Sequence, residues 1–395
     1  MALKTLDNYE LSNRRILIRI DINAALINNK PLDSPRFTEH AITISELIKK
    51  KAKVIIIAHQ GRKGDTDCIS LKDHAEILAS HVKSKIEFCP DLFGKEAQKA
   101  IENLKGGDSI LLENVRFYPD EDIKYEKNNY LKFCKQFDLF INDAFSVSHR
   151  AQGSIIFPPK FLPSTMGRIF QKEIIAADHF VKDKSEKKVY LLGGSKLEDY
   201  ISFFKVLNEK NNKILASGVL GNAFLACQGI DLGYENKWLK EKGYDKLFPK
   251  LKDLLNKYKD QIILPIDFAI GTKKREEILL EKAPIEEKLL DIGSTTIALF
   301  KEHIARASAI FVKGPLGFCE NSLFSKGTVE ILKYISSQTK NKKTYSLLGG
   351  GHLTTTLMTY NIPNNFSSIS LSGGALMAYL TGEPLPGLEA LKRSK

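Results

Sequence analysis

Residues 15–23 read RILIRIDIN, a short apolar run that ends in an aspartate and an asparagine. Residues 54–62 show the same pattern, because the apolar run VIIIA is followed by the polar residues and glycine of HQGR. Short runs rich in β-branched residues, bounded by polar or turn residues, are typical of strands that are buried on both faces of a parallel sheet. The two stretches therefore predict parallel strands whose ends carry chemically useful side chains.

Further runs of this kind alternate with stretches of helical period along the whole chain. The predicted strands cover residues 15–20, 54–58, 109–112 and 139–142, and then 189–192, 213–216, 261–264, 309–312, 345–348 and 367–370. So many parallel strands exceed one sheet of common size. The sequence therefore predicts an α/β protein with two doubly wound parallel-sheet domains joined by a hinge helix.

The predicted division lies in the middle of the chain, at an amphipathic stretch (166–181) followed by a polar run (182–188). Such a composition suits an interdomain connector. We predict a first domain over residues 1–170 and a second over residues 171–374. The charged stretch 271–290 is expected to be a surface excursion of the second domain.

Composition narrows the class of protein. The 395 residues are 43% hydrophobic and carry a formal net charge of +12, which indicates folded domains rather than disorder. No apolar run approaches the roughly 20 residues that cross a bilayer, and the first 15 residues lack the apolar stretch of a signal peptide. We expect a cytoplasmic protein with no membrane partner.

Two further classes are disfavoured. The five cysteines form no C-x-x-C pair, so neither a disulfide framework nor a zinc knuckle is predicted. Lysines are dispersed among acidic residues without an aromatic-flanked basic block, so no nucleic-acid partner is expected. The positive charge can instead steer small polyanions toward the protein.

Cationic, amide and carboxylate side chains follow the strands of the first half. They are Asp21, Asn23, His59, Gln60, Gly61, Arg62, Asn114, Arg116, Asn142, Asp143, His149 and Arg150, with Arg36 in addition. Ligands of open α/β sheets bind at the carboxyl ends of the strands, and clustered guanidinium groups need an anion among them. Each arginine could instead lie on a surface loop, and His59 and His149 could be structural. Placement after four separate strands favours a phosphorylated or carboxylated ligand.

Glycines follow the strands of the second half. The loops contain Gly193–Gly194 before Ser195 and Lys196, then Gly218, Gly221, Gly314, Gly317, Gly349–Gly351 and Gly373–Gly374. Backbone N–H groups at such turns, and the helix starts that follow, can bind phosphate oxygens. Glycine could also serve only the tight turns. Neither G-x-x-x-x-G-K-[ST] nor G-x-G-x-x-G occurs, which disfavours a P-loop enzyme and a dinucleotide-dependent oxidoreductase.

From about Leu6 to Leu391 the sequence resembles the phosphoglycerate kinase family. The matching segments are IRIDIN (18–23), AHQGR (58–62), LLENVRFY (111–118), NDAF (142–145), HRAQ (149–152), LLGGSK (191–196), LPID (264–267), DIG (291–293), KGPLGFCE (313–320), LLGGGH (347–352) and LPGLEAL (385–391). The resemblance implies two Rossmann-like domains that close on their substrates. It also implies a glycolytic phosphotransferase with a carboxyl acceptor, which interconverts 1,3-bisphosphoglycerate and Mg-ADP with 3-phosphoglycerate and Mg-ATP.

The resemblance also implies roles for individual residues. Triose substrate is expected at Asp21, Asn23, Arg36, His59, Gln60, Gly61, Arg62, Arg116 and Arg150. Nucleotide is expected at Lys196, Glu320, Gly349, Gly350, Gly351 and His352, with Glu320 on the ribose. Arg36, Lys196, Gly351 and Gly374 are expected to surround the transferred phosphoryl group, and the segment 375–395 to return to the first domain.

Some positions depart from the family pattern. His352 stands where many members have an aspartate that helps to hold Mg²⁺, so no protein ligand of the metal is predicted. Tyr200 stands where many have a second lysine, and both changes resemble the archaeal branch. Lys313, in place of an asparagine, is hypothesised to restore the missing cation, while Ser217 and Ser372 replace glycines. A catalytically weakened relative that only binds nucleotide or phosphosugar is the alternative, and no oligomeric state is predicted.

Overall fold

The computed structural model describes residues 3–182 and 187–394. The chain forms two compact units, an N-terminal unit (Met1–Ile175 with Gly382–Lys395) and a C-terminal unit (Ala176–Thr381). Along the chain the division falls inside helix α7 (Arg168–Lys182). Of the predicted connector loop, residues 183–186 lie outside the described residues. The two units are described separately below.

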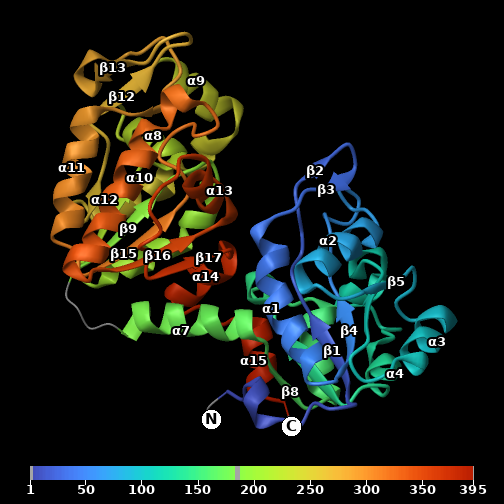
Figure 1. Ribbon diagram of the computed structural model, residues 1–395. Helices are drawn as coiled ribbons and strands as arrows, with labels where there is room; N and C mark the ends of the chain where they lie inside the picture. The colour runs from blue at the N-terminus through green and yellow to red at the C-terminus, as the bar shows by residue number, and fades with distance from the viewer. Residues whose placement is uncertain (1–2, 183–186, 395) are drawn as a thin grey trace. The chain divides into compact units, whose positions relative to one another are not determined.

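The N-terminal unit is built on a six-stranded parallel sheet with the order β5-β6-β4-β1-β7-β8 (Figure 1). The strands are β1 (Arg15–Arg19), β4 (Lys53–Ile57), β5 (Glu87–Cys89), β6 (Ser109–Leu112), β7 (Leu139–Asn142) and β8 (Ser164–Met166). Ile18 of β1 pairs with Ile56 of β4 and with Ile141 of β7. The residues after β1, β4, β6 and β7 therefore emerge at the same edge of the sheet.

Both faces of this sheet are covered. Ile16 and Ile18 of β1 belong to a buried cluster with helices α1 (Pro35–Lys49) and α2 (Lys72–Val82). Leu17 belongs to a second cluster with α3 (Lys95–Asn103) and α4 (Tyr130–Cys134). Successive residues of a strand point to opposite faces, so a continuous apolar run is what a doubly covered sheet requires.

Smaller elements complete this unit. They are the hairpin β2 (Leu26–Ile27) and β3 (Lys30–Pro31), and the helices α5 (Gly153–Ile156), α6 (Pro158–Phe161) and α15 (Pro386–Lys392). Helix α15 packs on α5, and the Gly387 N–H donates to the Ser148 carbonyl at 2.9 Å. The C-terminal segment thereby joins the N-terminal unit.

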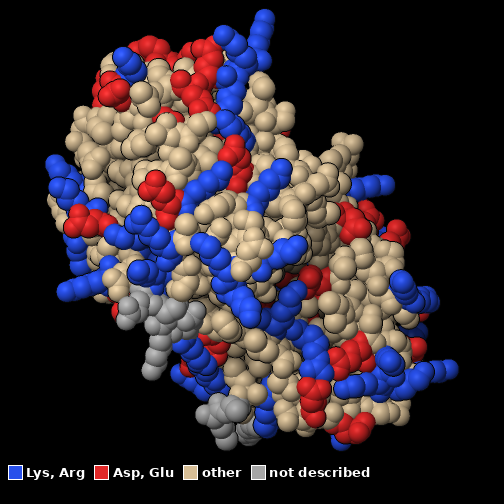
Figure 2. Space-filling view, turned by 60° about the vertical axis from the view of Figure 1, so that its left-hand side comes forward, with Lys and Arg blue, Asp and Glu red and all other residues tan. Residues whose placement is uncertain are grey.

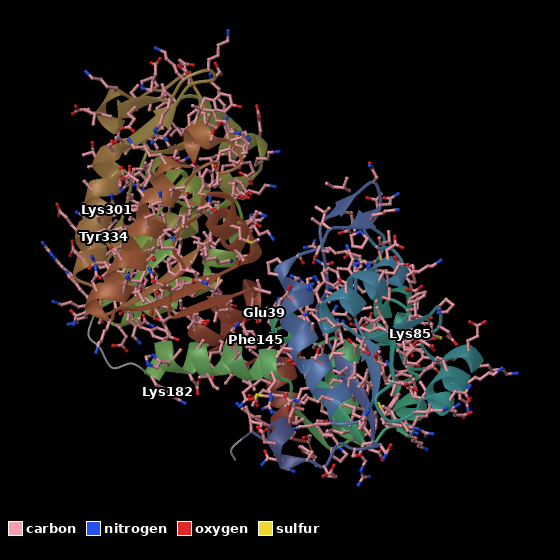
Figure 3. The ribbon with its side chains drawn as sticks, in the orientation of Figure 1. Glu39, Lys85, Phe145, Lys182, Lys301 and Tyr334 are labelled. Atoms are coloured by element: carbon pink, nitrogen blue, oxygen red, sulfur yellow. The ribbon has the colours of Figure 1, made fainter. Side chains whose placement is uncertain are left out.

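The first turn of α7 is fixed to this unit. Asp143 Oδ1 accepts hydrogen bonds from the backbone N–H groups of Ile169 (2.9 Å) and Phe170 (3.3 Å), which are free donors at a helix start. The ring of Phe170 packs edge-on against Phe145, which Figure 3 labels, with 5.3 Å between the centroids. A Cβ at Gly167 would lie 2.1 Å from Asp143 Oδ1, so only glycine fits there.

The C-terminal unit has a second six-stranded parallel sheet with the order β11-β10-β9-β15-β16-β17 (Figure 1). The strands are β9 (Lys188–Leu192), β10 (Lys213–Ala216), β11 (Ile262–Ile263), β15 (Ala309–Lys313), β16 (Tyr345–Gly349) and β17 (Ser368–Ser370). Lys313 at the end of β15 pairs with Leu192 of β9 and Gly349 of β16. The predicted glycine loops therefore follow strands that are neighbours.

This sheet is also covered on both faces. On one face, Val189, Ile310 and Val312 pack with α11 (Ser294–Ala305), α12 (Lys326–Lys342) and α13 (Gly351–Thr359). Figure 3 labels Lys301 of α11, whose ammonium lies 5.9 Å from the ring centroid of Tyr334 on α12. On the other face, the ring of Tyr190 packs against Phe203 and Phe311.

The remaining elements of the C-terminal unit flank the sheet. They are α8 (Gly218–Cys227), α9 (Tyr234–Glu241), α10 (Phe248–Lys257) and α14 (Gly374–Leu380), and an antiparallel sheet of β12 (Asp267–Ile270), β13 (Glu276–Leu279) and β14 (Asp291–Ile292). The predicted charged excursion 271–290 contains β13, whose residues are largely exposed.

The predicted α/β class with two doubly wound parallel sheets is confirmed, and every predicted strand is present with small differences at its ends. Of the strands that the sequence did not predict, β5 and β8 are three residues long, and β12 and β13 are four. Within the described residues no helix has the length and apolar character that a membrane span needs. Figure 2 shows Lys and Arg side chains over much of the visible face, interspersed with Asp and Glu.

One buried histidine makes stability of the N-terminal unit sensitive to acid. His74 of α2 is fully buried, and its Nε2 lies 3.0 Å from Gln60 Oε1. Burial lowers the pKa of His74 to about 4. Because the unfolded chain takes up this proton near pH 6.5 and the folded chain does not, stability that is present above pH 6.5 is lost as the pH falls toward 4.

We therefore expect His74→Gln to be less acid-sensitive than the unsubstituted protein. The free energy of unfolding of the unsubstituted protein should fall by about 1.4 kcal/mol for each pH unit below 6.5 on account of this one group. Urea unfolding between pH 7 and 5 measures the slope. His81→Gln on the same helix is the matched control and should keep the full slope. Equal slopes for His74→Gln and the control would contradict the prediction.

Candidate functional site

A buried carboxylate is the centre of the polar cluster in the N-terminal unit. Asp21 follows β1 and is only 3% exposed. It forms an ion pair with Arg36, from the first turn of α1, and accepts a hydrogen bond from the Ser146 hydroxyl. His59, which follows β4, places Nδ1 3.9 Å from Asp21 Oδ1. Side chains that follow two strands and begin one helix thus meet at Asp21.

The electrostatics of Asp21 and His59 are coupled. Although burial raises the pKa of Asp21, the positive charge of Arg36 and the hydrogen bond from Ser146 lower it below its usual range. Burial is the main cause that holds the pKa of His59 well below that of a free histidine. Asp21 is therefore ionised and His59 neutral at pH 7, and the cluster depends on Arg36 for its positive charge.

A second arginine lies beneath these residues. Arg19, the last residue of β1, is fully buried. Its Nε donates to Ser154 Oγ at 3.0 Å, and its Nη2 lies 3.1 Å from His59 Nδ1. The Ser154 hydroxyl also contacts Glu121 at 2.9 Å. Arg19 holds His59 in place, and since Arg19 is a donor only, His59 Nδ1 accepts and Nε2 carries the proton.

Arg116 and Arg150 extend the positive charge. Arg116 follows β6, is 7% exposed and donates to the Gly61 carbonyl. Burial lowers the pKa of Arg116 to about 10, with smaller contributions from the charges of Arg19 and Arg150. Arg150 is exposed, and its Nε lies 3.3 Å from His149. Several guanidinium groups so close together leave an excess of positive charge at this edge of the sheet.

Amide side chains hold the loops that carry these groups. Asn23 Oδ1 accepts from the Gly61 N–H at 2.8 Å, and Gln60 Oε1 accepts from the Ala24 N–H at 2.9 Å. The Asn114 amide donates to the Gln60 carbonyl at 2.9 Å. Gln60 is therefore turned into the protein. Arg62 is exposed, and only its backbone contacts Asp67, so no described side chain draws its guanidinium into the cluster.

The glycine turns of the C-terminal unit divide into two kinds. Gly193, after β9, and Gly314, after β15, lie against one another, because a Cβ on Gly314 (φ +77°) would lie 2.4 Å from the Gly193 carbonyl oxygen. Here glycine serves the close approach of two turns. At Gly350 (φ +109°) and Gly351, a Cβ would meet no other atom within 4 Å. The backbone before α13 is therefore open to a ligand.

Two lysines lie near these turns. Lys196 is exposed and follows the Gly193–Gly194 turn. Lys313 is 9% exposed, its Nζ lies 3.5 Å from Asp199 Oδ2, and its ammonium lies 4.8 Å from the ring centroid of Tyr200. Burial, and the nearby charge of Lys196, lower the pKa of Lys313 against the opposing effect of Asp199. The Tyr200 hydroxyl donates to the Gly193 carbonyl, so this side chain supports the turn.

A cavity of about 330 Å³ in this unit borders the same turns. Its lining includes Gly194, Gly218, Glu320 and His352. Of the predicted nucleotide residues, Glu320 and His352 reach it directly, while Lys196 and Gly351 are the chain neighbours of the lining residues Ser195 and His352. Gly374 begins α14, and the Cβ position of its neighbour Gly373 lies 3.7 Å from Lys313 Cε.

The cavity is also lined by residues that the sequence did not indicate. Glu235 of α9 is 3% exposed, and it accepts hydrogen bonds from the Leu289 N–H (3.0 Å) and the Asn222 side-chain amide (3.3 Å). Burial raises the pKa of Glu235, and these two hydrogen bonds oppose the shift. Trp238, one helical turn further along α9, lines the cavity as well.

The protein side chains offer little for a resident metal ion. Within the part of the chain that the structure describes, no three His, Cys, Asp or Glu side chains are grouped so as to hold one. His352 supplies an imidazole where Mg²⁺ prefers oxygen ligands. A magnesium ion at this site would have to bring most of its ligands with it, as phosphates and water.

Sequence reasoning missed several residues of the two clusters. A charged residue inside an apolar strand is a signal that could have indicated Arg19 in RILIR. Ser146, Ser154 and Glu121 carry no such signal, because ordinary loop residues of these types are common. Glu235 and Trp238 come from a helix that follows no strand of the sheet directly.

Comparison with known proteins agrees with this architecture. A family model described as phosphoglycerate kinase matches residues 6–383. The phosphoglycerate kinase of Methanopyrus kandleri is 36% identical and covers 98% of this chain and 97% of its own. That of Methanothermus fervidus is also 36% identical and covers 99% of this chain and 97% of its own.

A solved structure gives the same result in three dimensions. The phosphoglycerate kinase of Pyrococcus horikoshii superposes with a TM-score of 0.90 at 32% identity and covers 98% of both chains. This match extends over both parallel sheets and their helices. With the family model and the two archaeal relatives, it shows that the chain belongs to the phosphoglycerate kinase family, the kinases of glycolysis that transfer a phosphoryl group between 1,3-bisphosphoglycerate and ADP.

Proposed function

We propose that the N-terminal cluster binds the triose substrate of this kinase and that the C-terminal cavity binds its Mg-nucleotide. The observation that carries the proposal is the gathering of Arg36, Arg116 and Arg150 at one edge of one sheet, near the buried carboxylates of Asp21 and Glu121. The positive charge there exceeds what the described acidic residues neutralise. A substrate with a phosphate at one end and a carboxylate or acyl phosphate at the other would neutralise it.

The contacts assign different tasks to the N-terminal residues. Asp21 and Asn23 are positioned to accept from substrate hydroxyls or to hold the surrounding donors, and His59 carries its proton on Nε2, where it can donate to a substrate oxygen. Arg62, Arg116 and Arg150 would bind the phosphate of 3-phosphoglycerate. Gln60 and Gly61 are tied by backbone and amide hydrogen bonds, and we assign them to positioning rather than to direct charge neutralisation.

In the C-terminal unit, backbone groups replace side-chain charges. The open backbone at Gly349, Gly350 and Gly351, at the start of α13, would bind nucleotide phosphates through N–H groups. Glu320 would accept from the ribose hydroxyls at the cavity edge, and His352 would lie beside the phosphates. Lys196 would act as a mobile point charge on the transferred group.

In-line phosphoryl transfer spreads negative charge over three equatorial oxygens, so positioning and electrostatic stabilisation supply most of the catalysis. Arg36 on the triose side, and Lys196 with the N–H groups of Gly351 and Gly374 on the nucleotide side, are the groups that we assign to that charge. No covalent intermediate is needed. The two bound substrates must come within reach of one another, which is the domain closure that the sequence predicts.

Mg²⁺ enters this scheme as part of the substrate. We propose that the ion binds with the nucleotide phosphates and retains several waters, because His352 replaces the carboxylate that other members use. The coupled assay with Mg-ATP and 3-phosphoglycerate, followed by reduction of the acyl phosphate formed, tests the whole proposal. A folded protein that binds nucleotide but gives no turnover would indicate the weakened relative instead.

Arg36→Ala should lower kcat about a hundredfold, because the loss of one donor to the developing charge costs on the order of 3 kcal/mol. Arg36→Lys should recover part of the rate, since it keeps the charge but not the fork of donors. Steady-state kinetics in the coupled assay measures both. Arg14→Ala, which removes an exposed arginine paired with Asp138, is the control and should leave kcat unchanged. An Arg36→Ala rate within threefold of the control would contradict the role of Arg36.

Lys313→Met should weaken Mg-ADP binding roughly tenfold or more, which is the usual effect of losing one charge-assisted hydrogen bond. Methionine keeps the packing of the side chain on the Tyr200 ring while it removes the ammonium. Isothermal titration calorimetry measures the dissociation constant. Lys333→Met, at an exposed position of α12, is the matched control. An unchanged affinity for Lys313→Met would reject the hypothesis that this lysine supplies a phosphate-binding cation.

A further inference from the structure

The cavity of the C-terminal unit is also lined by polar side chains that phosphate binding does not explain. The glycine turns border it, and Glu235 and Trp238 of α9 and Asn222 of α8 line it as well. A volume of about 330 Å³ falls in the range of small-molecule sites. If the phosphates of a nucleotide bind at the turns, its base must occupy another part of the same cavity.

The hydrogen bonds that Glu235 makes are fixed in direction. The Leu289 N–H donates to Glu235 Oε1 at 3.0 Å, and the Asn222 amide donates to Glu235 Oε2 at 3.3 Å. An ionised carboxylate only accepts, so Asn222 must turn its NH₂ group toward Glu235 and its Oδ1 away. Within the described residues Oδ1 of Asn222 has no hydrogen-bond partner. Glu235 and Asn222 therefore present mainly hydrogen-bond acceptors to a ligand in the cavity.

An aromatic ring lies beside these acceptors. Glu235 and Trp238 are three residues apart on α9, and such residues share a helix face. Trp238 is the only tryptophan of the chain, it is half-buried, and the Lys288 ammonium lies 5.8 Å from its ring centroid. A planar base can pack against such a ring while its edge meets the acceptors.

We propose that Glu235, with Asn222, is a specificity-determining residue that selects nucleotides whose base carries an exocyclic amino group. The inference rests on the proposed nucleotide site. The 6-amino group of adenine donates two hydrogen bonds and fits an array of acceptors. The 6-oxo group of hypoxanthine is itself an acceptor, so in the position of the amino group it would face the acceptors of Glu235 and Asn222 with no proton between them.

A purely structural role for Glu235 makes a different prediction. If Glu235 only fastens α9 to the chain at Leu289, its substitution should weaken every nucleotide to the same extent. A role in reading the base must change the ratio of two affinities. ADP and IDP are suitable probes, because they differ only in the base and share ribose and phosphates.

The test measures binding of Mg-ADP and Mg-IDP to the full-length protein at pH 8, which favours the ionised carboxylate, through the fluorescence of Trp238 and by calorimetry. The unsubstituted protein should bind ADP about tenfold or more tightly than IDP. In Glu235→Gln this ratio should fall at least fivefold, because the glutamine amide can donate to a 6-oxo group. Asn222→Ala, which removes the Oδ1 acceptor, should lower the ratio as well.

Glu320→Gln is the matched control, since Glu320 is a carboxylate of the same cavity that we assign to the ribose. It should weaken ADP and IDP equally and keep their ratio. Equal affinities for the two nucleotides in the unsubstituted protein, or a ratio that survives both Glu235→Gln and Asn222→Ala, would overturn the inference and leave the proposed function intact. If neither nucleotide binds at all, the proposed nucleotide site fails and the inference fails with it.

Discussion

The polar cluster of the N-terminal unit depends on one buried carboxylate, Asp21. Arginines that converge at a sheet edge repel each other. The carboxylate of Asp21, which pairs with Arg36 and accepts a hydrogen bond from Ser146, provides a compensating charge among them. Since burial keeps His59 neutral, the histidine adds a donor without adding to the repulsion. Part of the positive charge of the arginines is therefore neutralised inside the protein, but a net positive charge remains. A multiply charged anion can bind to such a site.

The C-terminal unit, to which we assign the nucleotide, offers backbone groups in place of clustered arginines. Its described cations are few and its backbone is open, as at Gly350 and Gly351. Backbone N–H groups cannot change their protonation and carry no rotamer entropy, so they bind phosphate without the repulsion that several clustered arginines bring. Such turns restrict which residues can occupy them. Where Gly314 lies against Gly193, for example, there is no room for a side chain. Side-chain charge and backbone donors are thus alternative solutions, one in each unit.

The sequence predicted those features that follow from the parallel sheet alone. A buried strand must be apolar on both faces, so the strands could be read directly, and residues after neighbouring strands must meet at one edge, so Asp21, His59 and Arg116 could be placed together. The sequence could not predict those features of the site that depend on contacts between elements far apart along the chain. Arg19 is part of the site because Ser154 and His59 reach it from other segments. The close approach of Gly193 and Gly314 was also hidden, because it depends on how two turns that are far apart in the sequence meet.

The departures from the family pattern can be understood as redistribution of charge in the C-terminal unit. Tyr200 replaces a lysine but supports the Gly193 turn through its hydroxyl, and its ring packs beneath the ammonium of Lys313. A lysine is absent at position 200, but Lys313 is present at the end of the neighbouring strand β15. Its Nζ lies 3.5 Å from Asp199 Oδ2. A buried lysine with so distant a partner pays a desolvation penalty that a bound phosphate would offset. The same reasoning explains why His352 need not bind the metal, since phosphates that are held by N–H groups and lysines can carry Mg²⁺ themselves.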